Sequence, residues 1–261
     1  MSTVTLLEKI YSNSQLKLAN RILKSKFKGL QVETKISGIT SRGWIQIDIS
    51  GEDAKVALHY FTDEIGLCPA HIDDVKKFSM IRGRVTALDK NRDELYVDIG
   101  VSSPKIIYAK IALQHLQAQL VDGRKLAFRK LGELFGLCKN LPLTVKILNI
   151  DKEKKHLTAM LSEKQLSQYG NWIKSLMDRL VILGSPDYEL KLALKRAGLN
   201  RDVLNVEHLG LFEFALTCKL GTDAAGLIPK LGKNLQNATF TVFSPKKILQ
   251  SLDYSTTFIS L

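Results

Sequence analysis

Two pairs of alternating segments, each joined by a charged turn, constrain the fold of this chain more than any other feature. In the first pair, Met80–Leu88 and Glu94–Ile99 alternate apolar and polar side chains on either side of the turn Asp89–Asp93. In the second pair, Leu143–Ile150 and His156–Leu161 flank another charged turn. Alternation with a period of two around a polar turn is typical of half-buried antiparallel strands. We therefore expect two β-hairpins about 60 residues apart.

The residues between the two hairpins complete a recognisable order of elements. Lys105–Ala109 (KIIYA) predicts a third strand, and Leu113–Leu120 predicts a helical or irregular insert. A basic stretch, RKLAFRK, and a loop with Gly132 and Gly136 follow. Five short strands with a small helix between the third and the fourth are the order of an OB-type barrel.

The two hairpins also resemble a known family. GRVTALDKNRDELYVDIG and LTVKILNIDKEKKHLTAMLSEK resemble the first and last hairpins of an S1-like RNA-binding domain. The matching features are the Gly83-Arg84-Val85 strand, Tyr96 before Asp98-Ile99-Gly100, and the strand Val145–Asp151. The chain departs from this pattern where Ile106–Ala109 replaces the usual aromatic–His pair, and in the enlarged loop before the fourth strand. The resemblance covers about a third of the chain and implies an RNA-binding barrel.

The flanking segments predict an α/β unit on each side. The first 76 residues predict the order β-α-β-β-α, with strands at 3–10, 30–36 and 44–49, a basic helix from Asn13 or Ser14 to Gly29, and an acidic helix at 52–65. After the barrel we expect a long helix, Gln165–Leu183, a second helix that starts near Ser185, strands at 204–207, 211–219 and 238–243, and helices at 227–235 and 244–252. We thus predict an α+β multidomain fold with parts 1–76, 77–164 and 165–261, in which two small α/β domains flank an S1-like OB barrel.

A second resemblance extends over nearly the whole chain. The run CKLGTDAAGLIPKLG, Cys218–Gly232, together with the S1-like segment upstream, is similar to an uncharacterised family of archaeal proteins. That likeness implies an archaeal, cytoplasmic protein of three parts and no particular activity.

The positive charge is concentrated in the middle third of the chain. The formal net charge is +12, and residues 81–164, with 16 basic and 9 acidic side chains, contribute +7 of it. Localised positive charge indicates a phosphate-binding surface. The alternative is a general excess of charge in a protein adapted to heat or salt. A further candidate is the basic face of the first helix, with Lys17, Arg21, Lys24, Lys26 and Lys28; the alternative is that this face is simply solvated.

The candidate RNA contacts are lysines, arginines and two tyrosines of the barrel segment. Phosphate binding requires cations on one surface, and OB barrels add aromatic rings on which bases stack. Tyr96 and Tyr108 are the candidate stacking platforms, and each could instead pack within the barrel. The candidate phosphate partners are Arg82, Arg84, Arg92, Lys105, Lys110 and Lys146, with a second cluster of Arg124, Lys125, Arg129 and Lys130 in the enlarged loop.

The sequence offers little support for catalysis or a cofactor. The five histidines are scattered, and Cys68 and His71 have the spacing of half a zinc site without a second pair. The turn Lys219–Asp223 could receive an anion but is more readily explained as a structural turn. We expect no metal, no cofactor and no membrane helix, and three well-separated cysteines fit a reducing cytoplasm.

These features predict a cytoplasmic, non-catalytic protein that binds ribosomal or other structured or single-stranded RNA, in association with the ribosome or another RNA–protein machine. The alternative is a protein-interaction adaptor whose barrel docks a partner and whose acidic residues Asp63, Glu64, Asp73 and Asp74 meet a basic surface. A third possibility is an enzyme, and a cleft lined by Cys218, Thr222, Asp223 and His208 would support it.

Overall fold

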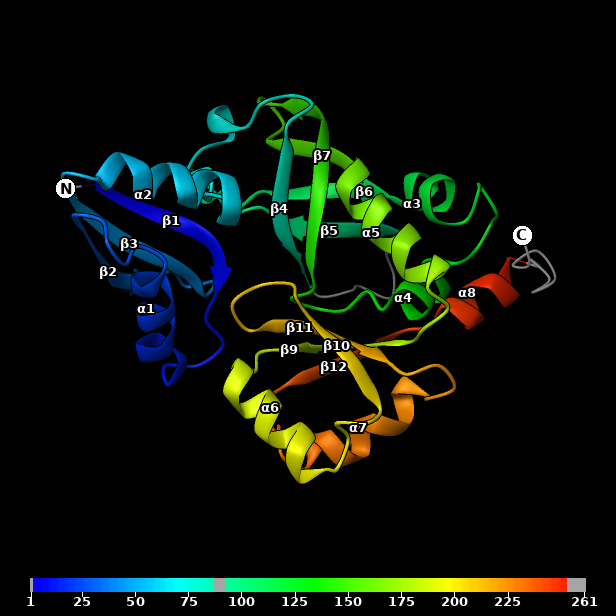
Figure 1. The fold of residues 1–261 in the computed structure, drawn as a ribbon. Helices are drawn as coiled ribbons and strands as arrows, with labels where there is room; N and C mark the ends of the chain where they lie inside the picture. Colours follow the sequence, from blue (N-terminus) through cyan, green and yellow to red (C-terminus); the bar gives the residue numbers. More distant parts are fainter. Residues whose placement is uncertain (1, 87–92, 253–261) are drawn as a thin grey trace.

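A computed structural model describes residues 2–86 and 93–252. Its first part is a three-stranded antiparallel sheet in the order β1-β3-β2, with helices against the face that carries Ile45, Ile47 and Ile49 (Figure 1). The predicted order β-α-β-β-α is present. The elements are β1 (Ser2–Lys9), α1 (Gln15–Ser25), β2 (Val32–Ile39), β3 (Trp44–Gly51) and α2 (Ala54–Tyr60), followed by a π-helical turn (Phe61–Ile65) and a 3-10 turn (Ile72–Asp74).

The middle part is a closed five-stranded barrel with strand order β4-β5-β6-β8-β7. Closure comes from β4, which pairs with both β5 and β7, and from the parallel pair β6–β8. This is an OB-like arrangement, as predicted. The elements are β4 (Met80–Val85), β5 (Glu94–Asp98), β6 (Tyr108–Ala112), α3 (Leu113–Leu120), α4 (Phe128–Phe135), β7 (Pro142–Asp151) and β8 (His156–Leu161).

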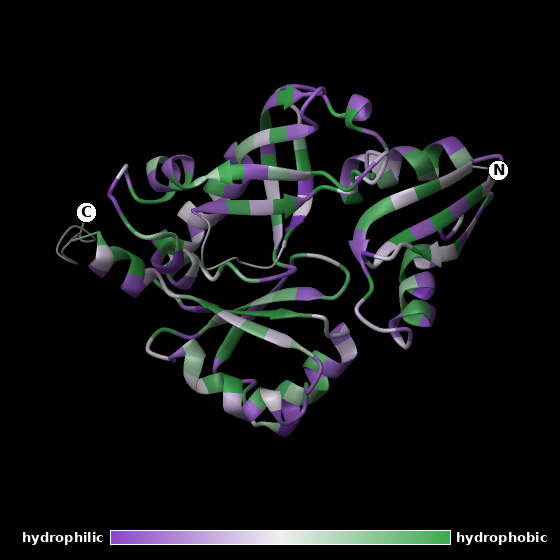
Figure 2. Ribbon diagram, turned by 180° about the vertical axis from the view of Figure 1, so that it is seen from behind, coloured by the Kyte–Doolittle hydropathy of each residue, from purple (hydrophilic) through white to green (hydrophobic). Residues whose placement is uncertain are grey.

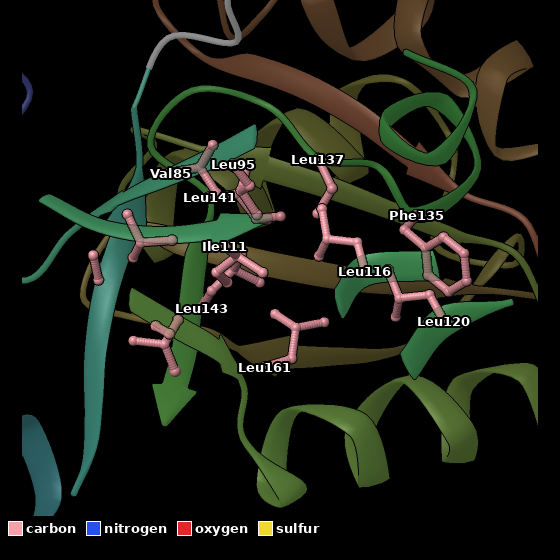
Figure 3. Packing of buried hydrophobic residues seen from close by; sticks show 14 of the residues in the cluster. Val85, Leu95, Ile111, Leu116, Leu120, Phe135, Leu137, Leu141, Leu143 and Leu161 are labelled. Carbon is pink, nitrogen blue, oxygen red and sulfur yellow. The ribbon is translucent and has the colours of Figure 1, made fainter. Parts of the chain in front are cut away.

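Alternation along the strands builds the barrel interior. Hydrophobic and hydrophilic residues alternate along the strands (Figure 2), so one row of each strand points inward. Leu95, Ile111 and Leu143 are fully buried there, and Leu116 of α3 lies against them at one end (Figure 3). The charged turn between β4 and β5 lies outside the described residues, apart from Asp93.

The first barrel strand requires a glycine at position 83 because neighbouring atoms leave no room for a side chain. A Cβ at this position would lie 2.6 Å from the carbonyl oxygen of Asp98 and 2.6 Å from a methyl of Val97. The strand here approaches β5 while it also pairs with β7, and any side chain would force the strands apart. The Gly-x-Val pattern therefore reflects close packing of the barrel wall.

The last part is a four-stranded antiparallel sheet in the order β10-β11-β9-β12. Helices α6 and α7 cover one face, and the other face contacts the barrel, α4 and α8 (Figure 1). The elements are α5 (Glu163–Lys174), β9 (Arg179–Leu183), α6 (Asp187–Arg196), β10 (Val203–His208), β11 (Glu213–Cys218), α7 (Ala224–Gly232), β12 (Thr239–Phe243) and α8 (Pro245–Ser251).

The long helix predicted over Gln165–Leu183 is wrong in its second half. Helix α5 ends at Lys174, Leu176 has a left-handed φ of 55°, and Arg179–Leu183 form the central strand β9. All five residues of β9 are buried because the sheet is covered on both faces. A short continuous apolar run fits a doubly buried strand and a buried helix equally well, so periodicity could not decide.

Two smaller differences concern the barrel segment. The third strand lies three residues later than predicted, at Tyr108–Ala112, and the enlarged loop contains a helix, α4. Phe128, Leu131 and Phe135 of α4 are buried against the last part of the chain. Because that partner surface is far away in the sequence, the loop interpretation missed the helix. The predicted part boundaries at residues 76 and 164 stay predictions.

Candidate nucleic-acid interface

The outer face of β5 and β6 carries the two predicted stacking residues. Tyr96 lies opposite Lys110, and Tyr108 lies opposite Asp98, in the antiparallel register of the two strands. Tyr108 is 37% exposed, and Tyr96 is half-buried with its hydroxyl donating to Glu94 Oε2 over 2.7 Å. Neither ring is sealed inside the barrel, where Leu95, Val97, Ala109 and Ile111 lie.

Glu94 offsets the positive charge on this face. Lys110 Nζ forms an ion pair with it. Burial alone would raise the pKa of Glu94, but hydrogen bonds from Lys110 and Tyr96 hold that pKa below its usual value. Lys110 therefore has a carboxylate partner in the free protein, and a phosphate would have to compete with it.

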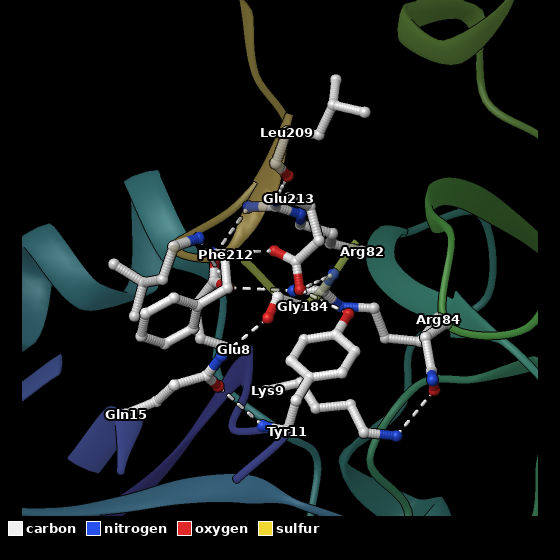
Figure 4. Close-up of polar contacts among 12 residues, drawn as sticks. Glu8, Lys9, Tyr11, Gln15, Arg82, Arg84, Gly184, Leu209, Phe212 and Glu213 are labelled. Atoms are coloured by element: carbon white, nitrogen blue, oxygen red, sulfur yellow. Dashed lines mark hydrogen bonds and ion pairs between the residues drawn. The ribbon is translucent and has the colours of Figure 1, made fainter. Parts of the chain in front are cut away.

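Arg84 corrects the sequence interpretation most clearly. We expected an exposed phosphate contact, but the side chain is 2% exposed and lies between two buried carboxylates (Figure 4). Its Nη2 donates to Glu8 Oε2 over 2.9 Å, and its Nη1 lies 2.8 Å from Glu213 Oε1. Burial disfavours the charge, yet the carboxylates of Glu213 and Glu8 raise the pKa of Arg84 above its usual value. The guanidinium belongs to a junction of β1, β4 and β11 and has no surface for RNA.

Arg82 and Tyr11 extend the same junction. Arg82 Nη1 lies 3.3 Å from Glu8 Oε1, and its Nη2 donates to the carbonyl oxygen of Leu209. Tyr11 donates its hydroxyl proton to Glu213 Oε1 over 2.7 Å, and burial together with that carboxylate raises the pKa of Tyr11 (Figure 4). Three parts of the chain, separated by up to about 200 residues, thus meet in one polar cluster. Sequence analysis missed Glu8, Tyr11 and Glu213 because no local pattern connects them.

The other predicted phosphate partners differ in their surroundings. Lys146 Nζ lies 2.7 Å from Glu163 Oε1, and Arg129 Nε lies 3.1 Å from Glu133 Oε1. Lys105, Lys125 and Lys130 are exposed and form no ion pair with a described residue, whereas Arg124 is half-exposed and has an interaction partner. Arg92 lies outside the described residues.

The structure does not bring the predicted set to one surface. Lys105 and Tyr108 lie where β6 begins, whereas residues 124–130 follow α3, which starts at the opposite end of β6. The second basic cluster runs into α4, which includes Arg129 and Lys130 and contacts β12 and α8 (Figure 1). The two clusters therefore belong to opposite ends of the barrel.

The basic face of α1 is a separate cationic surface. Lys17, Arg21 and Lys24 repeat at helical spacing, are exposed, and form no ion pair with a described residue. The opposite face of the helix buries Ala19 and Leu23 in the core of the first sheet. The charge of this helix face is therefore exposed to solvent.

Exposed apolar residues mark one barrel end that sequence analysis overlooked. Phe78 is 61% exposed and Met80 is 60% exposed, just before and at the start of β4. The signal was present in the sequence as an aromatic residue next to two lysines, Lys76-Lys77-Phe78. It was missed because Phe78 precedes the predicted strand Met80–Leu88 and no local periodicity indicates its exposure.

Cys218 and Asp223, which were considered for other chemistry, have structural surroundings. Cys218 is fully buried, and burial raises its pKa to about 11, while Asp223 caps α7 by accepting the Ala225 N–H. Within residues 2–86 and 93–252, no three His, Cys, Asp or Glu side chains are grouped as metal ligands would be. In that same part of the chain, no helix is long and apolar enough to span a membrane.

Family models match most of the chain in three consecutive segments. They are described as the DUF2110 N-terminal domain at residues 3–71, the DUF2110 central domain at 75–173 and the DUF2110 C-terminal domain at 177–243. No curated protein matches the chain.

Two solved structures are distantly similar. One is a chain in the crystal structure of the a/eIF2alpha–aDim2p–rRNA complex from Pyrococcus horikoshii OT3, with 13% identity over 49% of this chain and 70% of that chain and a TM-score of 0.26. The other is the crystal structure of a Thermus thermophilus protein, ttk003000868, with 12% identity over 97% of this chain and 43% of that chain and a TM-score of 0.20. At these TM-scores neither likeness supports an argument about function.

Proposed function

The chain belongs to the DUF2110 family, and we propose that it is a non-catalytic RNA-binding protein, a factor of the ribosome or another RNA–protein machine, with an S1-like use of its barrel. The observation that carries this proposal is the exposed ring of Tyr108 on the outer face of an OB-like barrel, close in sequence to Lys105, which pairs with no described carboxylate. A base can stack on an exposed ring, and lysines neutralise the adjoining phosphates.

The distribution of charge supports the same function. Residues 81–164 contribute +7 of the net +12. Arg82 and Arg84 are lost to the junction, but Lys105, Lys125 and Lys130 and the basic face of α1 remain available. These cations would release counterions when they bind phosphates, and this release makes affinity depend on salt.

Titration of the purified protein with single-stranded and hairpin RNA at rising salt tests the proposal. We expect binding at low salt and a logarithm of affinity that falls linearly with the logarithm of salt concentration, by about 0.7 per phosphate contact on single strands. Lys105→Glu should weaken binding, whereas Lys195→Glu on α6, an exposed lysine of the last part, should not. Absence of binding at low salt, or an affinity that salt does not change, would reject RNA binding.

A protein-docking role is the second candidate, and one observation favours it. Asp63 and Glu64 are exposed and line a cavity of about 500 Å³ where the three parts of the chain meet. A basic peptide segment would complement these carboxylates. Reversal of the charges of Asp63 and Glu64 should abolish capture of such a partner from native extract and leave the RNA affinity unchanged. If the variant loses RNA affinity, the two carboxylates do not form a separate docking site.

A further inference from the structure

Phe78 combines two unfavourable properties. Its ring is 61% exposed to solvent, and its backbone has a φ of 64°, in the left-handed region. That region disfavours every residue with a Cβ, and phenylalanine gains nothing here from burial. Glycine has a comparable φ elsewhere in this chain, at Gly136 with 65° and at Gly198 with 69°. Unfavourable backbone conformations retained in a fold are concentrated at functional sites.

The backbone around Phe78 is firmly held. The Phe78 N–H donates to the carbonyl oxygen of Ile147 over 2.8 Å, and the Ile147 N–H donates to the carbonyl oxygen of Ser79 over 3.0 Å. Ser79 Oγ donates to the carbonyl oxygen of Lys76 over 2.6 Å. The segment is therefore tied to β7 on one side, and the ring is presented from a fixed position. Little conformational entropy would be lost when a ligand covers it.

Three loops converge at this end of the barrel, which we call the β7–β8 end. It consists of residues 68–79, the β5–β6 loop (99–107) and the β7–β8 turn (152–155). The β-bridge His71–Ser103 joins the first loop to the second, and Lys152 Nζ lies 2.5 Å from Asp73 Oδ1, which joins the first loop to the turn. In Figure 1 the start of β4 and the end of β7 lie at the top.

One cation lies over the exposed ring, and other lysines belong to the same end of the barrel. Lys77 Nζ lies 5.1 Å from the centroid of the Phe78 ring. Four carboxylates, Asp73, Asp74, Asp151 and Glu153, share the β7–β8 end, and Lys152 already pairs with Asp73. Five exposed lysines of this end form no ion pair with a described residue: Lys76, Lys77, Lys105, Lys154 and Lys155.

This chemistry fits single-stranded nucleic acid better than a protein. An unpaired base offers a flat face to stack on a ring, and its phosphates suit nearby lysines, whereas the bases of a duplex are already stacked on one another. A protein interface of standard size would need about 800 Å² on this partner. Phe78 and Met80 expose too few apolar groups in this segment for an interface of that size, and two lysines directly precede Phe78.

We propose that Phe78 is a base-stacking platform at the β7–β8 end of the barrel and that a single-stranded RNA segment crosses this end with one base on its ring. The inference rests on the proposed RNA-binding function and adds the place, the strand type and the residue. It also assigns Lys76 and Lys77 to the phosphates beside the stacked base.

The first test compares Phe78→Gly with the unchanged protein on a 12-nucleotide single-stranded RNA. Loss of one stacked base should raise the Kd about 5- to 150-fold. Glycine adopts a positive φ without strain, so the Tm of this variant should be unchanged or higher, which separates lost contact from lost folding. The control is Tyr188→Ala on α6, which removes an aromatic ring of similar exposure, 59%, and should leave the Kd unchanged.

A second test separates stacking from phosphate binding. On an oligomer of the same length without bases, Phe78→Gly and the unchanged protein should bind equally. Phe78→Trp adds an exposed indole to a chain whose own tryptophans, Trp44 and Trp172, are 1% and 6% exposed. Its emission should be quenched by the RNA with bases and unaffected by the oligomer without them.

The outcomes distinguish this inference from the proposed function. If the unchanged protein binds RNA and Phe78→Gly binds it equally well, the platform is wrong and RNA binding stands. If the unchanged protein does not bind RNA at low salt, both are wrong. If Phe78→Gly loses a protein partner while its RNA affinity is kept, the surface serves protein docking and the inference is overturned.

Discussion

Arg84 lies in a barrel strand whose apolar and polar residues alternate, as in a strand with one face exposed to solvent. Its side chain is nevertheless buried. Its position in Gly83-Arg84-Val85 suggested a phosphate contact, but the outer side of β4 faces Glu8 and Glu213 rather than solvent. Alternation separates the inside of the barrel from the outside. It does not say whether the outside is covered by another part of the chain.

Replacement of Arg84 tests the junction at the scale of one residue. Arg84→Met should lower the free energy of unfolding by about 3–5 kcal/mol, because two buried carboxylates lose their shared cation. Urea denaturation followed by circular dichroism measures this change. Lys125→Met, at an exposed lysine, should stay within about 0.5 kcal/mol of the unchanged protein.

A triple variant gives the complementary result. Addition of Glu8→Gln and Glu213→Gln to Arg84→Met removes the unpaired charges and should recover part of the lost stability. If Arg84→Met alone costs less than about 1 kcal/mol, the junction does not stabilise the fold as the distances suggest.

At the scale of elements, the loop between β10 and β11 joins parts that lie far apart in the sequence. Phe212 in this loop is fully buried in the hydrophobic cluster of the first sheet, with Phe61 and Ile45. The backbone N–H of Leu211 donates to Glu8 Oε2 over 3.3 Å beside it. The hairpin of the last part therefore supplies a core residue to the first.

Truncation of the Phe212 side chain should destabilise the first sheet, although Phe212 belongs to the last part of the chain. Phe212→Ala should cost about 3–5 kcal/mol through the cavity it leaves. Hydrogen exchange should report faster opening in β1 and β3 as well as in the hairpin itself. Leu204→Ala on the same hairpin removes a side chain that is 58% exposed and should change neither. Exchange that rises only in β10 and β11 would show that the two parts are stabilised independently.

The elements also show where sequence patterns succeed and where they do not. Strands with one covered face, such as β3 and β7, alternate clearly and were predicted within a few residues. Strand β9 was assigned to a helix because burial on both faces removes the alternation. Helix α4 was missed because its apolar side, with Phe128 and Phe135, is explained only by the distant strand β12.

At the scale of the whole molecule, the barrel and the last sheet share one hydrophobic cluster. Leu131 and Phe135 of the barrel segment pack with Tyr169, Phe243 and Ile248. The rings of Phe135 and Phe243 lie 5.9 Å apart, edge to face. The predicted middle part is therefore not covered on all sides by its own residues.

This shared core predicts how fragments of the chain behave. Residues 77–164 alone should lack a cooperative thermal transition, because Leu131 and Phe135 would be exposed to water, whereas residues 77–261 should unfold cooperatively. Differential scanning calorimetry of the two fragments and the full chain checks this expectation. A cooperative transition in the shorter fragment would show that the barrel folds independently of the last sheet.

Like the fold, the candidate interface could be predicted only in part from the sequence. The exposure of Tyr108 and Lys105 could be predicted from sequence because strand alternation and charge are local properties. The burial of Arg84 and the exposure of Phe78 could not be predicted in this way, because both depend on segments elsewhere in the chain.

The amino-acid order by itself determined the α+β class, the barrel strands and the charge of the middle segment, since these follow from side-chain periodicity and composition over short distances. Only the tertiary structure decided which cations remain exposed, which strand is buried on both faces and which barrel end presents an aromatic ring. These properties depend on contacts between residues up to about 200 positions apart, and no local pattern encodes such contacts.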